Sequence, residues 1–174
     1  MKTITKLATL ASAFLSVVAV GFARAAEDTP YSPYLSQVED NVVLAGALDL
    51  DALRASREGT IRVIDRRTEG EGAPEEAAAA AALGISYTNI PVSSATIDSA
   101  QVAELKDALG AARPDELVVV HCRSGNRAGL LWGAAQLEAG VPLEVVQENV
   151  SGIVTSEPIA EGLESYAKQL DAGL

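Results

Sequence analysis

The sequence predicts an α/β fold with a mostly parallel central sheet flanked by helices. Two observations support this prediction. Short apolar runs alternate along the chain with segments of helical pattern, and this alternation is typical of parallel sheets covered by helices. The run Leu117–Val120 is also apolar without interruption, as in a central strand that is buried on both faces. A chain of 174 residues has room for one core of this kind.

Each element follows from its local pattern. The expected strands are apolar or alternating runs at residues 42–45, 61–65, 85–90 and 117–120. The expected helices have helical periodicity or an Ala/Glu composition, and comprise one that begins near residue 48, then 75–83, 99–111, 127–139 and 158–170. Pro74 precedes the second of these helices, and Gly84 and Gly140 end two of them.

The first 25 residues form a separate unit. Lys2 and Lys6 precede an uncharged apolar run, and Ala23 and Ala25 occupy the −3 and −1 positions of an A-x-A cleavage site. This pattern is typical of a secretory signal peptide; an uncleaved N-terminal anchor is the alternative. The expected organisation is a signal peptide over 1–25, a lead-in segment over 26–40 and a folded domain over 41–174. We expect the mature protein to be periplasmic or secreted, and not to contact a membrane after cleavage.

Composition excludes several classes of function. The chain has 13 Lys and Arg against 24 Asp and Glu, for a net charge of −11. This balance opposes sequence-independent binding to nucleic acid or to anionic lipid, both of which need clustered cations. The single Cys cannot form an intramolecular disulfide, and one Cys with one His cannot build a structural zinc site. We therefore expect no metal, no other cofactor and no nucleic-acid partner.

The candidate chemistry follows the central strand, where residues 117–129 have the sequence LVVVHCRSGNRAG. A loop that enters a helix at the carboxyl end of a parallel strand points its backbone N–H groups at an anion. The same environment lowers the pKa of a thiol. Cys122 is therefore the candidate nucleophile and Arg127 the candidate bidentate clamp on an oxyanion. The backbone of the intervening residues would bind the substrate, namely Arg123, Ser124, Gly125 and Asn126. Cys122 as a small buried apolar residue is the alternative, which the flanking loop and Arg127 oppose.

Supporting roles are open to several neighbours. His121, the only histidine, either is a satisfied polar group beside the sheet or orients the loop. The Arg123 side chain is more simply a solvated cation than a second anion contact. Arg67 and Glu69 follow another parallel strand and reach the same sheet edge. Arg67 is expected to add positive potential for substrate binding and Glu69 to position Arg127, unless both lie in an exposed charged loop.

A family resemblance adds to this pattern. HCRSGNRAG resembles the His-Cys-loop-Arg signature of cysteine-dependent phosphatases. VVLAGAL at 42–48, IRVIDRRTEGEG at 61–72 and LGISYTNIPV at 83–92 resemble segments of one branch, the beta-lactamase hydrolase-like protein, phosphatase-like domain family. The resemblance covers residues 38–140. It implies a cysteine phosphatase-like three-layer sandwich and hydrolysis of phosphate monoesters through a phosphocysteine. The implied substrate is a phosphorylated small molecule or a phosphoprotein.

Two positions depart from the usual phosphatase pattern. The loop between Cys122 and Arg127 has four residues, whereas most of these phosphatases have five. The resemblance to the branch named above implies that its members also have the short loop. Ala128 stands where a Ser or Thr hydroxyl commonly helps the sulfur to leave. We therefore expect slow turnover of the intermediate.

A phosphatase also needs an acid to protonate its leaving group. Asp98 is the carboxylate of the loop that follows Ile90 and Pro91, where related enzymes carry theirs. The competing interpretation of Asp98 is a cap on the helix that begins at Ser99.

Two other functions remain open. CRSGNR also resembles the active loop of rhodaneses, which are sulfurtransferases, so sulfur transfer through a Cys122 persulfide is the first alternative. The Gly-His-Ile segment that rhodaneses normally carry is missing here, which favours the phosphatase-like fold. The second alternative is a non-catalytic anion-binding module, which Ala128 and the uncertain acid make credible.

Overall fold

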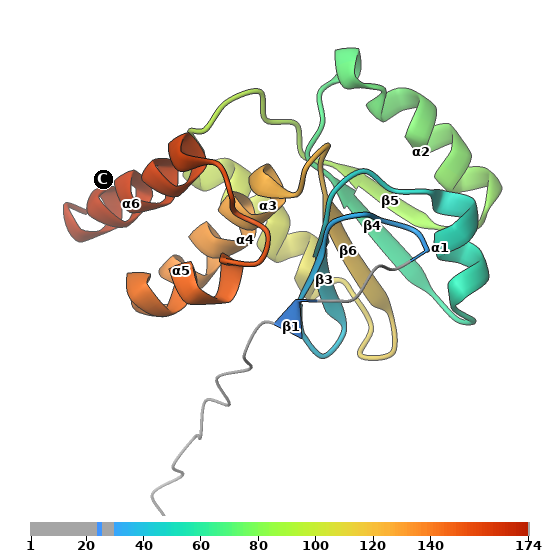
Figure 1. Cartoon of the computed structure of the whole chain (residues 1–174), viewed down its shortest axis with the longest axis horizontal. Coiled ribbons are helices and arrows are strands. Elements are labelled where there is room, and N and C mark those ends of the chain that lie inside the picture. Colours follow the sequence, from blue (N-terminus) through green and yellow to red (C-terminus); the bar gives the residue numbers. More distant parts are fainter. Residues whose placement is uncertain (1–23, 26–29, 174) are drawn as a thin grey trace, which may run out of the picture.

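A computed structural model describes residues 24–25 and 30–173 of the chain. Its sheet has the strand order β1-β2-β3-β6-β4-β5 (Figure 1). β3, β6, β4 and β5 run parallel, and β1 and β2 join the edge beside β3 in antiparallel pairing. The strands are β1 Arg24–Ala25, β2 Leu35–Glu39, β3 Val42–Ala45, β4 Ile61–Asp65, β5 Ser86–Asn89 and β6 Leu117–His121.

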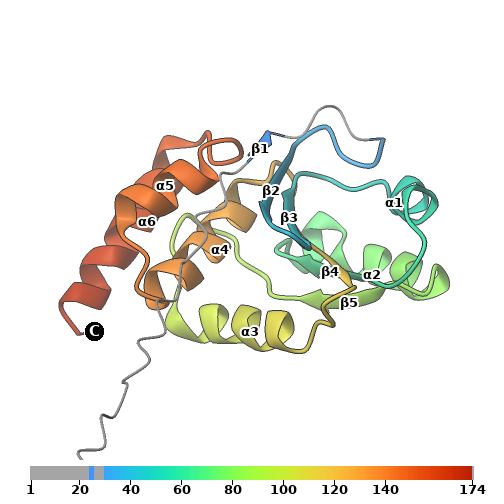
Figure 2. The same ribbon diagram turned by 90° about the horizontal axis from the view of Figure 1, so that it is seen from below.

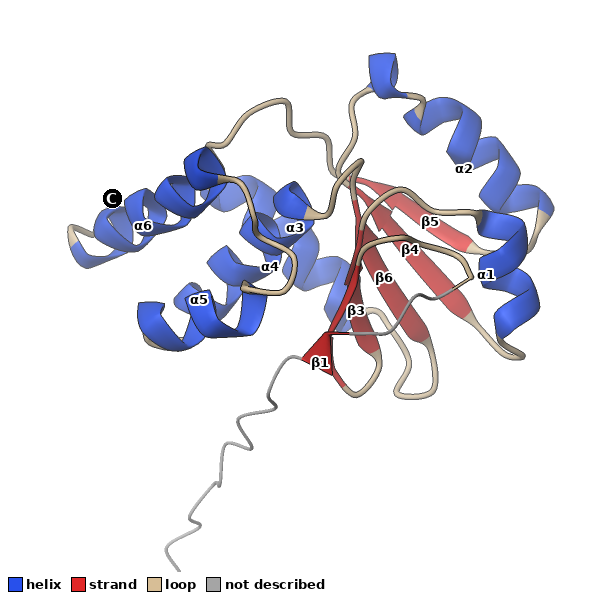
Figure 3. Cartoon of the chain, viewed as in Figure 1, coloured by secondary structure: helices blue, strands red, loops and turns tan. Residues whose placement is uncertain are grey.

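Helices cover both faces of this sheet, which gives three layers (Figure 3). α1 and α2 lie on one face, and α3, α4, α5 and α6 lie on the other (Figure 2). The helices are α1 Leu50–Ser56, α2 Ala73–Ala82, α3 Ser99–Gly110, α4 Asn126–Glu138, α5 Leu143–Val150 and α6 Glu157–Asp171, with a 3-10 turn η1 at Glu69–Glu71. The loops after β4, β5 and β6 gather along one edge of the sheet (Figure 1), as parallel strands require.

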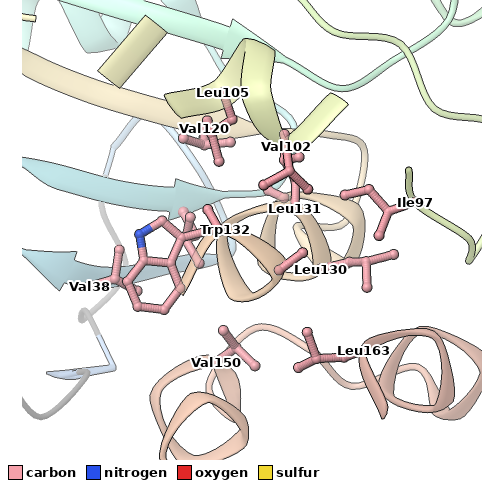
Figure 4. Packing of buried hydrophobic residues seen from close by; sticks show 14 of the residues in the cluster. Val38, Ile97, Val102, Leu105, Val120, Leu130, Leu131, Trp132, Val150 and Leu163 are labelled. Atoms are coloured by element: carbon pink, nitrogen blue, oxygen red, sulfur yellow. The ribbon is translucent and has the colours of Figure 1, made fainter. Parts of the chain in front are cut away.

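The larger of two apolar clusters lies between the sheet and α3–α6. Figure 4 shows its centre, where Trp132 of α4 packs toward Val38 of β2 and Val150 lies opposite. The indole N–H of Trp132 donates to the Glu39 carboxylate at 3.3 Å, so the ring is buried while its polar atom keeps a partner. α4 is thus enclosed on both sides, and the loop at its first turn has a rigid base.

The predicted fold class is confirmed, and every predicted strand and helix is present with its ends moved by a few residues. β2 lies in the expected lead-in segment and pairs with β3, so the sheet begins before residue 41. α5 was not expected, since its sequence LEVVQENV contains adjacent β-branched residues that lower helix propensity. Packing of Val146 and Val150 against the core compensates for this local preference.

The expected signal peptide lies outside the described residues, except for Arg24 and Ala25 of β1. Within the described part of the chain, none of the helices has the length and apolar character that a membrane span needs.

Candidate active site

The loop from β6 to α4 wraps around the sulfur of Cys122. This residue follows β6 directly and is fully buried. Its N–H donates to the Ala45 carbonyl at 3.3 Å, and the Gly125 N–H lies 3.2 Å from the sulfur. Gly125 has φ of 85°, and a Cβ there would lie 2.3 Å from Cγ1 of Ile153. Glycine is therefore required both by the backbone conformation and by the close approach of the α5–α6 segment.

The other loop residues separate into exposed and anchored positions. Arg123 and Ser124 are exposed. The Asn126 side chain is anchored, because its Oδ1 accepts from the backbone N–H of Thr155 and of Ser156, each at 2.8 Å. Asn126 therefore ties the loop to the segment that precedes α6, and only its backbone is left to bind a substrate.

Arg127 is held rigidly beside the loop. Its Nη1 and Nη2 donate to Oε2 and Oε1 of Glu71 at 2.8 and 2.6 Å, a bidentate pair. Nη1 also donates to the Val92 carbonyl at 2.6 Å and to the Arg66 carbonyl at 3.4 Å. The bond to Glu71 raises the pKa of Arg127, and the charge of Cys122 adds to this effect. The guanidinium is thus pre-oriented next to the sulfur before any substrate arrives.

The partner of Arg127 is Glu71, so the expected role of Glu69 is wrong. Glu69 is exposed, and the turn η1 carries the next acidic residue inward. Oε2 of Glu71 accepts from the backbone N–H and the hydroxyl of Thr68, both at 3.0 Å. This is a capping box, and the spacing Thr-x-x-Glu is its sequence signal. That signal could have identified Glu71 in advance.

Glu71 should make the stability of the protein depend on acid. Hydrogen bonding to Arg127 lowers the pKa of Glu71 from 4.5 to about 2. A carboxyl group whose pKa falls on folding stabilises the protein fully above its unfolded pKa, and this contribution is lost as the pH falls through the folded pKa. The variant Glu71→Gln should therefore unfold more easily at pH 7 and lose less stability than wild type between pH 4.5 and 2.

Urea unfolding curves across that pH range would measure the difference. Glu69→Gln is the matched control, because it removes the same charge two residues away from an exposed position. Equal pH dependence in wild type and Glu71→Gln would contradict the assigned pairing.

Arg67 and His121 belong to a second polar network, below the loop on the α2 side. The Arg67 guanidinium is paired with the carboxylates of Asp65 and Glu76. Nε2 of His121 lies 2.7 Å from Oε1 of Glu76 and 3.5 Å from Oδ1 of Asp65, and Tyr87 donates to Asp65 at 2.6 Å. The positive charge of Arg67 is thus already compensated, which opposes its expected role as a substrate ligand. His121 is buried and held against carboxylates, in keeping with a loop-orienting role.

This network also has the spacing of a metal site. Ligand atoms of Asp65, Glu76 and His121 all lie within 4.8 Å of one another. Burial would raise the pKa of Asp65, but the bonds from Arg67 outweigh it, and the pKa lies below its ordinary value. A metal ion would have to displace Arg67, which already supplies the cation that these carboxylates need.

Asp98 caps α3. Its carboxylate accepts from the Gln101 N–H at 2.9 Å, and the Gln101 side chain accepts from the Asp98 N–H at 3.2 Å. Asp98 also lines a polar cavity of about 280 Å³ together with Ser93 and Ser94. Val92, which accepts from Arg127, lines the same cavity. The capping role is therefore observed, and the general-acid role stays a prediction.

Arg66, which directly follows β4, is fully buried. Its Nη1 donates to the Ile90 carbonyl at 2.8 Å, while its Nε and Nη2 have no hydrogen-bond partner among the described residues. Its backbone N–H donates to the His121 carbonyl at 2.9 Å, directly before the candidate nucleophile. Burial, together with the charge of Arg127, lowers the pKa of Arg66 to about 10.

Comparison with solved structures shows that this arrangement is built on a known fold. P. aeruginosa TpbA in complex with pTyr is 18% identical, with a TM-score of 0.63 over 87% of this chain and 91% of that chain. The Siw14 catalytic core is 12% identical, with a TM-score of 0.65 over 85% of this chain and 95% of that chain. At these identities the likeness establishes the fold, and the expected cysteine phosphatase-like sandwich is confirmed.

Sequence comparison extends the likeness to a family. A "Beta-lactamase hydrolase-like protein" of Xylella fastidiosa is 28% identical over 109 residues, which are 59% of this chain and 25% of that protein. The chain thus matches about a quarter of the length of this curated relative. A family model described as "Beta-lactamase hydrolase-like protein, phosphatase-like domain" matches residues 35–139, from β2 to the end of α4. Since this match spans more than half of the chain, the protein belongs to that phosphatase-like domain family.

Proposed function

We propose that the protein is an exported, cysteine-dependent phosphatase that hydrolyses phosphate monoesters. The observation that carries the proposal is the joint placement of Cys122 and Arg127, with the thiol buried inside the loop and the guanidinium fixed by Glu71. Family membership supports the same chemistry. Export rests on the signal-peptide pattern of residues 1–25.

The proposed reaction has two steps. The Cys122 thiolate attacks phosphorus while the P–O bond to the alcohol breaks, and Asp98 gives the leaving oxygen its proton. Water then attacks the phosphocysteine, the P–S bond breaks, and the thiolate and inorganic phosphate are released. Backbone N–H groups of residues 123–127 and the Arg127 guanidinium stabilise the equatorial oxygens. Glu71 is unsuited to act as the acid, because its bond to Arg127 lowers its pKa to about 2.

A paired assay tests the proposal. Purified mature protein, kept reduced, is assayed on an aryl phosphate and on thiosulfate with cyanide, and acid-quenched samples are analysed by mass spectrometry. We expect phosphate release and a phosphoryl group on Cys122, both absent from Cys122→Ala. Thiocyanate production with one added sulfur on Cys122 would instead identify a sulfurtransferase. Inactivity in both assays, with oxyanions still raising the melting temperature, would indicate an anion-binding module.

The role of Asp98 should depend on the leaving group. Asp98→Asn is expected to lower kcat about 10²- to 10⁴-fold for an alkyl phosphate, whose alkoxide needs a proton, and far less for p-nitrophenyl phosphate. Asparagine is a good helix cap, so the start of α3 should be preserved. Steady-state kinetics on both esters measure the effect.

Gln101→Ala is the control for this prediction, because it removes the side chain that accepts from the Asp98 N–H and leaves the carboxylate in place. Equal losses on both esters, or the same loss in Gln101→Ala, would show that Asp98 acts only as a cap.

A further inference from the structure

The loop between β5 and α3 passes beside the C-terminal helix α6 (Figure 1), and the two main chains meet at Gly162. A Cβ on Gly162 would overlap the carbonyl oxygen of Ala95 and would lie 3.2 Å from its carbonyl carbon. Gly162 has helical backbone geometry, which any residue can adopt. The close approach of the loop is therefore what requires glycine here.

The helix α6 is firmly anchored at this contact. Ile159, Leu163 and Tyr166 on α6 are buried in the larger apolar cluster. The Tyr166 hydroxyl donates to the Glu138 carboxylate of α4 at 2.6 Å, and Lys106 of α3 donates to the same carboxylate at 3.1 Å. Because α6 is tied to the core and to a carboxylate shared with α3, a larger residue at the contact would displace the loop more easily than the helix.

The loop is held mainly at its two ends. Val92 at one end and Asp98 at the other are hydrogen-bonded to neighbouring elements. Among the described residues, no hydrogen bond joins residues 93–97 to another element, and those of Ser94 and Thr96 stay within the loop. Cavities of about 280 and 270 Å³ border this stretch. The middle of the loop therefore rests against α6 and has space into which it can move.

A shift at Ala95 would be passed on to Asp98, which follows it by three residues. Burial and the bond to Glu138 raise the pKa of Tyr166 on α6, and the charge of Asp98 adds to this effect. Burial lowers the pKa of Arg66, and the charge of Asp98 acts against that change. The Asp98 carboxylate is thus within electrostatic range of α6 and of an arginine beside the site.

We infer that Gly162 is a positioning residue for the acid of the reaction. By letting the main chain of α6 meet the Ala95 carbonyl, it sets where the loop holds Asp98 relative to the leaving oxygen. This inference rests on the proposed function, in which Asp98 protonates that oxygen. Gly162 lies beyond residue 139, where the family match ends, so the acid is positioned by a part of the chain outside the matched domain.

Gly162→Ala tests the inference, because it adds only the Cβ that the Ala95 carbonyl excludes. We expect kcat to fall about 10- to 10²-fold for an alkyl phosphate, since a misplacement on the order of 1 Å can cost this much. For p-nitrophenyl phosphate, whose leaving group needs no proton, kcat should fall less than about twofold. Tungstate should stabilise the variant against heat as it does wild type, because the loop around Cys122 is unchanged.

Two controls separate positioning from general destabilisation. Gly110→Ala makes the same change in α3, where a Cβ would meet no atom within 4 Å, and should leave kcat on both esters unchanged. In an Asp98→Asn background, Gly162→Ala should lower kcat no further, because the group that it positions is already absent. An unchanged kcat in Gly162→Ala, equal losses on both esters, or additive losses with Asp98→Asn would overturn the inference.

A second variant covers the case in which Gly162→Ala does not fold. Ala95→Gly loosens the loop backbone at the same contact without adding an atom to α6. It should again lower kcat for the alkyl phosphate more than for p-nitrophenyl phosphate, and equal effects on the two esters would count against the inference.

Failure of the inference can be distinguished from failure of the proposed function. If Asp98→Asn shows the expected dependence on the leaving group and Gly162→Ala does not, the acid role stands and the inference alone is wrong. If wild type releases no phosphate, or if Asp98→Asn affects both esters equally, the acid role is refuted and the inference falls with it.

Discussion

Replacing Cys122 by serine is expected to abolish phosphate release, with a fall in kcat of at least about 10⁴-fold. Serine has nearly the same shape as cysteine, but its hydroxyl ionises only at far higher pH. Among the described residues, no side chain is placed beside it as a base that could activate it. The Gly125 N–H that now points at the sulfur can donate to the new hydroxyl, so the loop should stay folded. Steady-state phosphate release and calorimetric unfolding measure the two halves of this prediction.

Retained binding distinguishes loss of the nucleophile from loss of the site. Tungstate should still stabilise Cys122→Ser against heat, because Arg127 and the backbone donors are unchanged. Full activity in Cys122→Ser protein would show that the thiol is not the nucleophile. A fall in activity together with a lost tungstate response would instead show that the sulfur holds the loop together.

Replacing Arg127 by lysine should lower kcat/KM by about 10²- to 10³-fold, the range observed when one donor to a developing anion is removed. The guanidinium bonds both oxygens of Glu71 and two backbone carbonyls. An ammonium group has no planar fork and cannot serve all of these partners at once. Kinetics on one aryl phosphate, compared across variants, provide the measurement.

Glu71→Gln is the matched partner for this prediction. It leaves Arg127 charged but no longer fixed by a bidentate ion pair, so we expect a smaller loss of kcat/KM than in Arg127→Lys. The double variant should have a kcat/KM no lower than that of Arg127→Lys alone. Additive losses would indicate that the two residues act separately. Near-normal activity in Arg127→Lys would show that charge, without directional bonding, is sufficient.

The β6–α4 unit could be predicted from sequence because its signals are local. A buried strand, a short polar loop with glycine and a following helix each have their own pattern, and they place Cys122 and Arg127 without knowledge of the rest of the chain. The same applies to the strand at residues 61–65 and to the Ala-rich α2. Two elements were not predicted, namely the strand β2 in the expected lead-in segment and the helix α5, which depends on tertiary packing.

The residues around the loop could not be predicted in the same way. Arg66 and Arg67 are adjacent, yet the side chain of the first is buried and donates to the Ile90 carbonyl, while that of the second pairs with Asp65 and Glu76. Which arginine faces which network depends on how β4 ends against its neighbours. Glu69 and Glu71 are likewise close in sequence, and the conformation of the turn η1 determines which of them reaches Arg127. The sequence indicates a charged loop after β4, but which charged residues pair with one another is set only in the folded chain.

The anchoring of Asn126 to residues 155 and 156 has a consequence for the order in which the molecule is completed. Cys122 and Arg127 are both present once the chain has been synthesised as far as residue 127. Gly125 and Asn126, however, contact Ile153 and Ser156, which are added nearly thirty residues later. A nascent chain that ends before Ile153 thus carries all the candidate reactive groups without the support that shapes their loop. The loop therefore reaches its final shape only after residues 153–156 have been added to the chain.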